Sequence, residues 1–293
     1  MDEAIERAGE FEIIVSHRIG PEMFDRADRL KFYIIPFTGL PVSDREELLR
    51  RRHITVLNSH FNAVFAAEHA LGLLLTAARH TIPAHDKMKK GDWTPRYAGQ
   101  WGVTMLKRNV LLLGFGAIGR KLAEMLRPFD AHISAVSRTG GDSHPADFHG
   151  TSDDLHRLLP EADALICTLP HTPATDNFVN ADVFERLKEG AVFVNVGRGP
   201  VVNEKALHDA LSGGRLRAAA IDTWWHYPSS EEMRSKTPPS RFPLNEFENV
   251  VFSPHRATHV EGREFDRMED VARLVNSCVN GEPHNIVDLE ELY

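Results

Sequence analysis

The feature that most constrains the fold of this chain is a repeated alternation of short apolar runs with helical segments. From residue 110 onward the apolar runs read NVLLLGFG, AHISAVS, ADALICTLP, GAVFVNVG, LRAAAID and NVVFSPH. Several of them are apolar at every position rather than at alternate positions, which is typical of strands in a parallel sheet covered on both faces. The pattern predicts a doubly wound α/β architecture.

A shorter version of the same alternation comes first. The runs FEIIV, KFYIIPF and ITVLN are predicted strands, and PEMFDRADRL and SDREELLRR are predicted helices. The stretch AAEHALGLLLTAARH has little polar surface, so we expect a helix that is buried nearly all round. At 293 residues the chain suits two domains better than one.

Composition excludes several classes of protein. A net charge of −8 and a pI near 6.1 argue against nucleic acid or an anionic membrane as the main partner. The acidic start MDEAIERAGE is unlike a signal peptide, and the longest apolar stretch contains Asn62, Glu68 and His69, which disfavours a membrane span. The two cysteines suit free thiols in a reducing compartment, so a soluble cytoplasmic protein is expected.

A glycine motif follows the first apolar run of the second block. Gly114, Gly116 and Gly119 form G-x-G-x-x-G between a predicted strand and a predicted helix, with Ala117 and Ile118 between the last two glycines. In that context the motif indicates a dinucleotide site, where backbone amides at the helix start hold a pyrophosphate. The alternative is a glycine-rich turn that serves packing only.

Cofactor preference is expected to depend on the end of the next strand. There the chain reads AVSRTGG, with Ser137 and Arg138 where an acidic residue would contact the ribose 2′-hydroxyl of NAD. A hydroxyl and a guanidinium suit a 2′-phosphate, because arginine offers two charge-assisted donors. The sequence therefore predicts NADP rather than NAD. The alternative is a solvated arginine in a loop.

Three further side chains stand at or just beyond the ends of later strands, where open α/β sheets bind ligands. They are Arg198 in NVGRG, Asp222 in AIDTWWHYP and His255 in SPHRATH. An arginine can bind a carboxylate, an aspartate can orient an amide, and a histidine can transfer a proton near neutral pH. Taken singly, each has a structural explanation as well. His255 and His259 have the spacing of a metal pair, but no third ligand is evident, so no metal site is predicted.

Together these stretches resemble the D-isomer-specific 2-hydroxyacid dehydrogenase family, which includes the NAD-dependent formate dehydrogenases. The resemblance covers nearly the whole chain and is carried by AAEHALGLLLTAARH, GFGAIGRKLAEMLRPFDAHI, LPHTPATDNFVN, GAVFVNVGRGPVVNEKALHDAL, AAAIDTWW and FSPH. It implies an NAD(P)-binding Rossmann domain over residues 73–259 and a shortened flavodoxin-like substrate domain over residues 1–72 and 260–293. It also implies a homodimer formed with the long apolar helix.

The resemblance also implies roles for individual residues. Arg198 binds the substrate carboxylate and carbonyl oxygen, and His255 is the acid–base residue. Substrate is further bound by residues of the smaller domain, Thr38, Gly39 and Asn62. Six further residues are implied to contact the cofactor, in addition to the glycine motif and to Ser137 and Arg138. They are Thr168, Pro170, Thr175, Val196, Gly197 and Asp222.

Two departures from the family pattern affect the predicted site. Phe37 stands where the carboxylate-binding loop usually has a second glycine, and Pro41 follows Gly39 closely, which favours a pocket for small substrates. Tyr227 stands where the family has a glutamate, or a glutamine in formate dehydrogenases. We expect Tyr227 to contact His255 and to be part of the catalytic group. Trp224 and Trp225 either line the site or pack its loop.

The sequence thus predicts an NADP-preferring D-2-hydroxyacid dehydrogenase, a reductase of small 2-oxoacids such as glyoxylate or hydroxypyruvate. Two alternatives remain open. One is formate oxidation, against which Ser137, Arg138 and Tyr227 argue. The other is a dinucleotide-binding sensor that has lost the reaction, which Tyr227 favours and the pair Arg198 and His255 disfavours.

Overall fold

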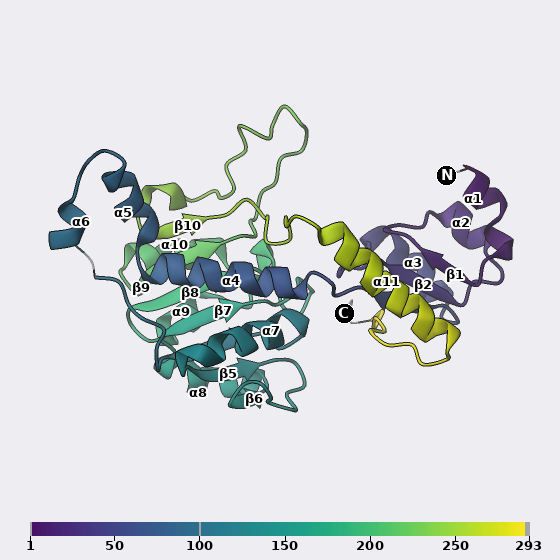
Figure 1. The fold of residues 1–293 in the computed structure, drawn as a ribbon, viewed down its shortest axis with the longest axis horizontal. Helices are drawn as coiled ribbons and strands as arrows, with labels where there is room; N and C mark the ends of the chain where they lie inside the picture. The colour runs from purple at the N-terminus through teal and green to yellow at the C-terminus, as the bar shows by residue number, and fades with distance from the viewer. Residues whose placement is uncertain (1, 100, 291–293) are drawn as a thin grey trace. The chain divides into compact units, whose positions relative to one another are not determined.

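The computed structural model describes residues 2–99 and 101–290, and these divide into two compact units (Figure 1). Unit 1 comprises residues 1–63 and 258–293, and unit 2 comprises residues 64–257. The predicted boundaries, 72/73 and 259/260, lie further along the chain. The first division falls earlier because the helix after residue 63 packs with unit 2.

Unit 2 is built on a seven-stranded sheet in the order β10-β9-β8-β7-β4-β5-β6, with every pair parallel. The chain starts in the middle of the sheet at β4, proceeds outward through β5 and β6, then returns to β7 on the other side of β4. This reversal creates a switch point between β4 and β7. The strands are β4 (Asn109–Leu113), β5 (His132–Val136), β6 (Phe148–Gly150), β7 (Ala164–Cys167), β8 (Ala191–Asn195), β9 (Leu216–Ile221) and β10 (Val250–Phe252).

Helices cover both faces of this sheet, which is why most positions in its central strands are apolar. On one face, α4 and α7 pack on Val110, Leu112 and Ile166, and Figure 1 shows these helices in front of the sheet. On the other face, α8, α9 and α10 pack on Leu111, Leu165 and their neighbours. The helices of unit 2 are α4 (Ala63–Ala78), α5 (Thr81–Met88), α6 (Thr94–Tyr97), α7 (Ala117–Leu126), α8 (Leu155–Leu158), α9 (Ala181–Arg186) and α10 (Glu204–Ser212).

Unit 1 has a three-stranded parallel sheet in the order β1-β2-β3. Buried residues of α2 and α3, with Tyr33, Ile35 and Val56, fill one face, and α11 packs on Ile34 and Leu57 from the other. The elements are α1 (Asp2–Glu6), β1 (Ile13–Val15), α2 (Pro21–Arg26), β2 (Phe32–Ile35), α3 (Val42–Arg50), β3 (Thr55–Asn58) and α11 (Arg263–Val279). Both units are therefore α/β with parallel sheets, as the sequence predicts.

The long apolar helix α4 is less enclosed than its sequence suggests. Its residues Ala67, Ala70, Leu74 and others lie in the core of unit 2, but Val64, Glu68 and Gly72 are exposed. These exposed positions recur every fourth residue and so form a single stripe along the helix. Among the described residues, no helix has the length and apolar character that crossing a membrane requires.

Candidate functional site

The glycine motif lies at the switch point of the unit 2 sheet, where open α/β sheets place their ligands. Gly114 directly follows β4, and Thr168 directly follows the neighbouring strand β7. Gly114 has φ +96°, and a Cβ built there would lie 2.6 Å from Thr168 Oγ1. At Gly119 an added Cβ would lie 2.3 Å from the Gly114 carbonyl oxygen. These two glycines therefore allow a tight turn and the close packing of α7 on that turn.

Gly116 differs from its two neighbours in the motif. A Cβ built at Gly116 meets no atom within 4 Å, and the residue is exposed. It is the N-cap of α7, and a glycine has no side chain that could cap the amides of Ala117 and Ile118 in the first turn. Open space above uncapped helix amides fits the pyrophosphate of a dinucleotide. The residues present therefore fit an NAD(P) cofactor at this position.

The predicted selectivity residues follow β5 at the same edge of the sheet. Arg138 is exposed and Ser137 is partly buried. Ser137 Oγ lies 2.7 Å from His149 Nε2, and the Ser137 N–H donates to the Gly150 carbonyl at 3.1 Å. His149 comes from β6, a short edge strand that the sequence analysis did not identify.

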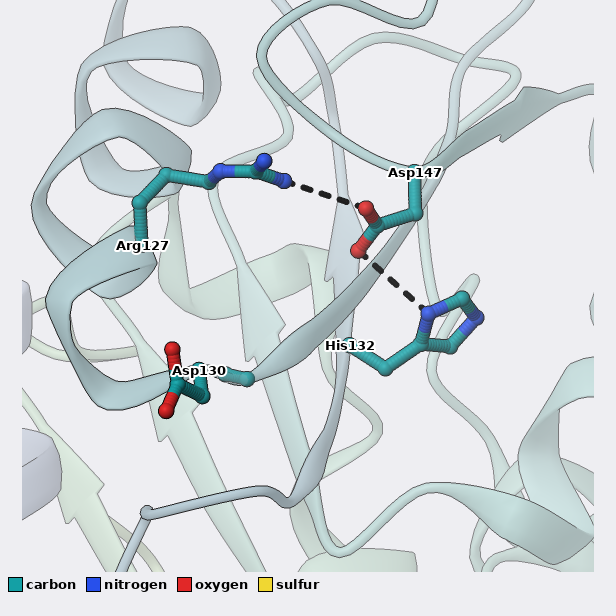
Figure 2. A pocket seen from close by; sticks show the side chains of 5 residues that line it. Arg127, Asp130, His132 and Asp147 are labelled. Carbon is teal, nitrogen blue, oxygen red and sulfur yellow. Dashed lines mark hydrogen bonds and ion pairs between the residues drawn. The ribbon is translucent and has the colours of Figure 1, made fainter.

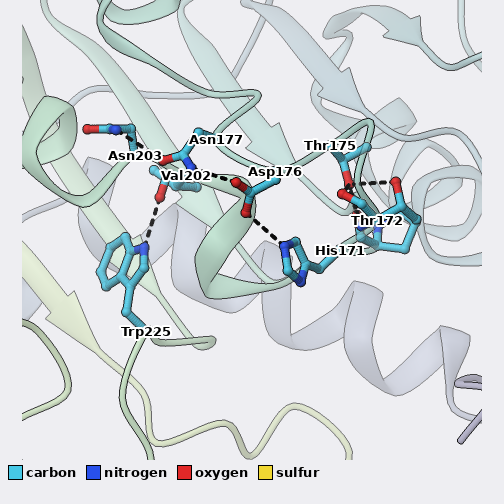
Figure 3. Close-up of polar contacts among 9 residues, drawn as sticks. His171, Thr172, Thr175, Asp176, Asn177, Val202, Asn203 and Trp225 are labelled. Atoms are coloured by element: carbon cyan, nitrogen blue, oxygen red, sulfur yellow. Dashed lines mark hydrogen bonds and ion pairs between the residues drawn. The ribbon is translucent and has the colours of Figure 1, made fainter. Parts of the chain in front are cut away.

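The loop after β7 is held by its own polar contacts (Figure 3). Thr175 Oγ1 donates to the Pro170 carbonyl at 2.6 Å and accepts from the Thr172 N–H at 2.8 Å. His171 Nε2 contacts Asp176 Oδ1 at 2.9 Å. Thr175 therefore shapes the loop that carries Pro170. The predicted contacts of Thr168, Pro170 and Thr175 with the adenosine side stay predictions.

A buried carboxylate organises the opposite half of this edge. Asp222, directly after β9, has no solvent exposure and accepts hydrogen bonds from Ser253 Oγ, from the Arg256 N–H at 3.0 Å and from the Ala257 N–H at 3.3 Å. His69 Nε2 lies 3.4 Å from Asp222 Oδ1 and 2.9 Å from Ser253 Oγ. Burial alone would raise the pKa of Asp222, but the hydrogen bonds from His69, Ser253 and the Arg256 amide hold that pKa below its ordinary value.

The two backbone amides that donate hydrogen bonds to Asp222 directly follow the candidate catalytic histidine, His255, in the chain. His255 has φ +52°, a left-handed conformation that costs free energy in a residue with a Cβ. Asp222 bonds the two peptide N–H groups that follow His255, so it helps hold this strained turn. Its predicted role toward the nicotinamide amide stays a prediction.

Tyr227 contacts His255, as the sequence predicts. The hydroxyl of Tyr227 lies 2.9 Å from His255 Nδ1, and it accepts from the Trp224 N–H at 3.1 Å. Burial raises the pKa of Tyr227 above its ordinary value; the Trp224 amide and the charge of Arg198 act in the opposite direction, and the charge of Asp222 adds to the rise. A neutral phenol beside the imidazole provides a hydrogen bond but no counter-charge.

Arg198 follows β8 on a loop that buried polar groups support. The side chain of Asn195, which has no solvent exposure, donates to the Arg198 carbonyl at 3.1 Å and accepts from the Gly197 N–H at 3.1 Å. A Cβ built at Gly199 would lie 2.1 Å from the Trp224 carbonyl oxygen, so this loop approaches the segment 222–227 closely. Arg198, Tyr227 and His255 thus belong to one group within unit 2.

The two tryptophans pack the loop. Trp224 is 5% exposed, stacks on Phe252 with ring centroids 4.9 Å apart, and donates from Nε1 to the Ser253 carbonyl at 2.7 Å. Trp225 Nε1 donates to the Val202 carbonyl at 2.8 Å (Figure 3). Both indoles therefore stiffen the segment that carries Tyr227.

The predicted substrate residues of unit 1 lie beside one another. Thr38 Oγ1 donates to Asn62 Oδ1 at 3.0 Å, and Asn58 Nδ2 donates to the Thr38 carbonyl at 2.6 Å. A Cβ built at Gly39 meets no atom within 4 Å. The Asn58 side chain thus holds the backbone at Thr38. The open space beside Gly39 leaves room for a small anion.

A hollow of about 300 Å³ on unit 2 lies elsewhere (Figure 2). Asp147 there bonds Arg127 at 3.0 Å and contacts His132 at 3.3 Å. Because His132 begins β5, the hollow lies at the amino ends of the strands, opposite the edge that binds ligands in such sheets. We do not assign it to the site. Within residues 2–99 and 101–290, no cluster of three or more His, Cys, Asp or Glu side chains could hold a metal ion.

Comparison with known proteins decides the family. The model of the D-isomer-specific 2-hydroxyacid dehydrogenase NAD-binding domain matches residues 71–257. The chain belongs to the D-isomer-specific 2-hydroxyacid dehydrogenase family. It is therefore an NAD(P)-dependent oxidoreductase that acts on CH–OH groups.

Individual relatives agree with this assignment. The chain is 31% identical to an uncharacterised protein of Corynebacterium melassecola over 87% of its own length and 81% of the relative. It is 30% identical to a glyoxylate reductase of Thermococcus kodakarensis, with 94% and 82% covered. Among solved structures, an NADPH-dependent glyoxylate/hydroxypyruvate reductase of Sinorhizobium meliloti is 26% identical with a TM-score of 0.72, and 94% and 84% of the chains are covered.

Sequence reasoning missed four supporting residues of this dehydrogenase. They are His69, His149, Asn195 and Ser253, which hold Asp222, Ser137 and the Arg198 loop. Two signals could have found some of them: His69 is a polar residue in an otherwise apolar helix, and Asn195 interrupts an apolar strand at its carboxyl end.

Proposed function

We propose that this dehydrogenase is an NADP-preferring reductase of small 2-oxoacids of the glyoxylate or hydroxypyruvate kind. The observation that carries the proposal is the group of Arg198, Tyr227 and His255 beyond the carboxyl ends of β8, β9 and β10, with Tyr227 bonded to His255. A guanidinium and a titratable imidazole are what reduction of a 2-oxoacid requires. A protein that only binds a dinucleotide requires neither.

The proposed reaction uses these side chains as follows. The guanidinium of Arg198 binds the carboxylate and the carbonyl oxygen of the 2-oxoacid and stabilises the negative charge that develops on that oxygen. His255 in its protonated form gives a proton to the same oxygen, so that the product is the 2-hydroxyacid. When bound, the nicotinamide cofactor supplies the hydride that reduces the carbonyl carbon.

Positioning residues support this chemistry. Asp222 and Ser253 hold the turn of His255, and the Trp224 N–H holds the hydroxyl of Tyr227. In unit 1, Thr38 and Gly39 are proposed to bind the carboxylate through their backbone. A small pocket is proposed because Phe37 replaces a glycine there, and its ring packs against the Arg267 guanidinium at 5.2 Å.

The preference for NADP rests on Ser137 and Arg138, because a 2′-phosphate accepts hydrogen bonds and carries negative charge. The NADPH dependence of the Sinorhizobium reductase supports this preference.

A cytoplasmic homodimer is part of the same proposal. The segment from α5 to β4 exposes a group of large apolar side chains that a second copy would cover, namely Ile82, Met88, Trp93, Tyr97, Trp101 and Leu106.

A panel of 2-oxoacids assayed with NADPH and with NADH tests the proposal. We expect turnover of glyoxylate or hydroxypyruvate, a higher kcat/KM with NADPH, and loss of turnover in His255→Ala with cofactor binding retained. Turnover of formate with NAD and of no 2-oxoacid would establish the formate alternative. Dinucleotide binding without any turnover would establish the sensor alternative.

A further inference from the structure

We infer that His149 is a specificity-determining residue that couples the choice between NADP and NAD to its own protonation. This inference rests on the proposed role of Ser137 at the 2′-position of the cofactor. It adds a residue on a separate strand, β6, whose ring contacts Ser137 and the glycine turn.

The hydrogen bonds of His149 determine which ring nitrogen carries the proton. His149 Nδ1 lies 2.9 Å from the carbonyl oxygen of Asp142, and a carbonyl can only accept, so Nδ1 donates. In the neutral ring Nε2 therefore has a lone pair. Since Nε2 lies 2.7 Å from Ser137 Oγ, the neutral ring must accept the hydroxyl proton of Ser137.

Protonation of His149 reverses that second hydrogen bond. With both ring nitrogens protonated, Nε2 donates to Ser137 Oγ, and the hydroxyl proton of Ser137 becomes available to another acceptor. The same change adds a positive charge next to Ser137. Ser137 thus offers only lone pairs when His149 is neutral and offers a donor when His149 is charged.

The two cofactors respond oppositely to this reversal. A 2′-phosphate has acceptor oxygens and negative charge, so it gains from a donor and a cation at Ser137. A ribose 2′-hydroxyl can itself donate to the lone pairs that Ser137 presents beside neutral His149. Protonation of His149 therefore shifts the cofactor preference toward NADP, and loss of that proton shifts the preference toward NAD.

The surroundings of His149 fix the ring and set its electrostatics. The ring packs on Phe115 with centroids 4.8 Å apart, and the Arg120 guanidinium lies over the same Phe115 ring, 4.5 Å from its centroid. Arg120 itself donates to the carbonyls of His144 and Asp142, at 2.6 and 3.3 Å. The charged or titratable groups on the elements around β6 come from four segments. They are Arg120, Lys121 and Glu124 on α7, His132 on β5, Arg138, Asp142, His144 and Asp147 between β5 and β6, and Asp153, Asp154, His156 and Arg157 in the segment after β6.

None of these neighbours replaces His149 in the reversal. Arginine stays charged across the pH range in which histidine ordinarily titrates. The other imidazoles on these elements belong to His132, His144 and His156. His132 contacts Asp147 and His156 contacts Asp182, so the test includes a variant of His144.

The test measures binding of fragments rather than activity. Calorimetric titration gives the affinities of 2′,5′-ADP and 5′-AMP for the full chain at pH 5.5, 7 and 8.5. In the wild type we expect the ratio of the two affinities to favour 2′,5′-ADP by roughly 10- to 100-fold more at pH 5.5 than at pH 8.5, the range for a hydrogen bond to a charged group. Repeating the titration in buffers of different ionisation enthalpy should show proton uptake on 2′,5′-ADP binding.

Variants separate His149 from the phosphate, whose own second ionisation lies near pH 6. His149→Gln keeps a polar side chain that does not titrate, so its affinity ratio should follow only the ionisation of the phosphate and should show less proton uptake. His149→Arg should favour 2′,5′-ADP at all three pH values. His144→Gln, the matched control, should behave like the wild type. Circular dichroism confirms that each variant is folded.

The outcomes distinguish this inference from the proposed cofactor preference. A wild type that prefers 5′-AMP at every pH would contradict the preference for NADP itself. A wild type that prefers 2′,5′-ADP with the same pH dependence as His149→Gln would overturn the role of His149 and leave the cofactor proposal standing.

Discussion

Replacing Asp222 by asparagine should loosen the turn that carries His255, although the two side chains have almost the same shape. In the wild type Oδ1 accepts from Ser253 and the Arg256 N–H, and Oδ2 accepts from the Ala257 N–H. An asparagine amide has only one acceptor end. In either orientation its NH₂ group faces a donor that is already in place.

The magnitude follows from those contacts. Losing one hydrogen bond to a charged acceptor costs about 1.5–3 kcal/mol, and a buried donor left without an acceptor costs about 1–3 kcal/mol. We therefore expect Asp222→Asn to lower the free energy of unfolding, or of local opening of the turn, by about 2.5–6 kcal/mol. The loss should be at least about 2.5 kcal/mol, because Asp222 has no solvent exposure that would let water replace the lost partners.

The assay is native-state hydrogen exchange without cofactor, combined with urea unfolding. The amides of Arg256 and Ala257 should exchange about 50-fold faster or more in Asp222→Asn, since each 1.36 kcal/mol changes the exchange rate about tenfold. Asp209→Asn is the control, because Asp209 is an exposed partner of Lys205, and its loss should leave the exchange of both amides unchanged. Unchanged protection of both amides in Asp222→Asn would refute the reasoning.

The same carboxylate predicts a dependence on pH. Its pKa is lower in the folded protein than in an unfolded chain, so its contribution to stability is present above the ordinary aspartate pKa and is lost as the pH falls through the folded value. Asp222→Asn should therefore lose less stability than the wild type between neutral pH and about pH 3. Parallel acid unfolding curves would contradict this.

Further predictions concern the site and the glycine turn. Arg198→Lys should lower kcat/KM for 2-oxoacids at least about a hundredfold while NADPH affinity stays within about twofold, because lysine lacks the two-pronged donor; near-wild-type turnover would remove Arg198 from the site. Tyr227→Glu should move the alkaline limb of the reduction profile to higher pH, because a carboxylate favours protonated His255, and Tyr227→Phe should slow the reaction; three superimposable profiles would show that Tyr227 has no such role. Gly116→Ala should keep the thermal stability but weaken NADPH binding, whereas Gly119→Ala should lower stability, because its methyl group would meet a backbone carbonyl; equal melting temperatures for the two variants would contradict this difference.

Much of the fold follows from local features of the sequence. The runs that became β4, β5, β7, β8 and β9 are mostly apolar because both faces of a parallel strand are covered, and this requirement is readable without knowing what covers them. Strand β6 was missed because FHG is short and half polar, and it pairs with β5 at an edge where only one neighbour is needed. The sequence does not reveal the exposed stripe on α4, because Val64 and Gly72, two of its three residues, are not polar.

The candidate site divides in the same way. Gly114, Gly116 and Gly119 were readable because their spacing between a strand and a helix forms a known motif. Arg198, Asp222 and His255 were readable because each stands just beyond the end of a strand, and Tyr227 was readable because it departs from the family pattern. The tertiary structure alone decided which groups meet: His69 on α4 with Ser253 after β10, His149 on β6 with Ser137 after β5, and Asp222 with amides some thirty residues further on. Hydrogen bonds between distant segments depend on how strands are ordered in the sheet, and no local pattern in the chain records that order.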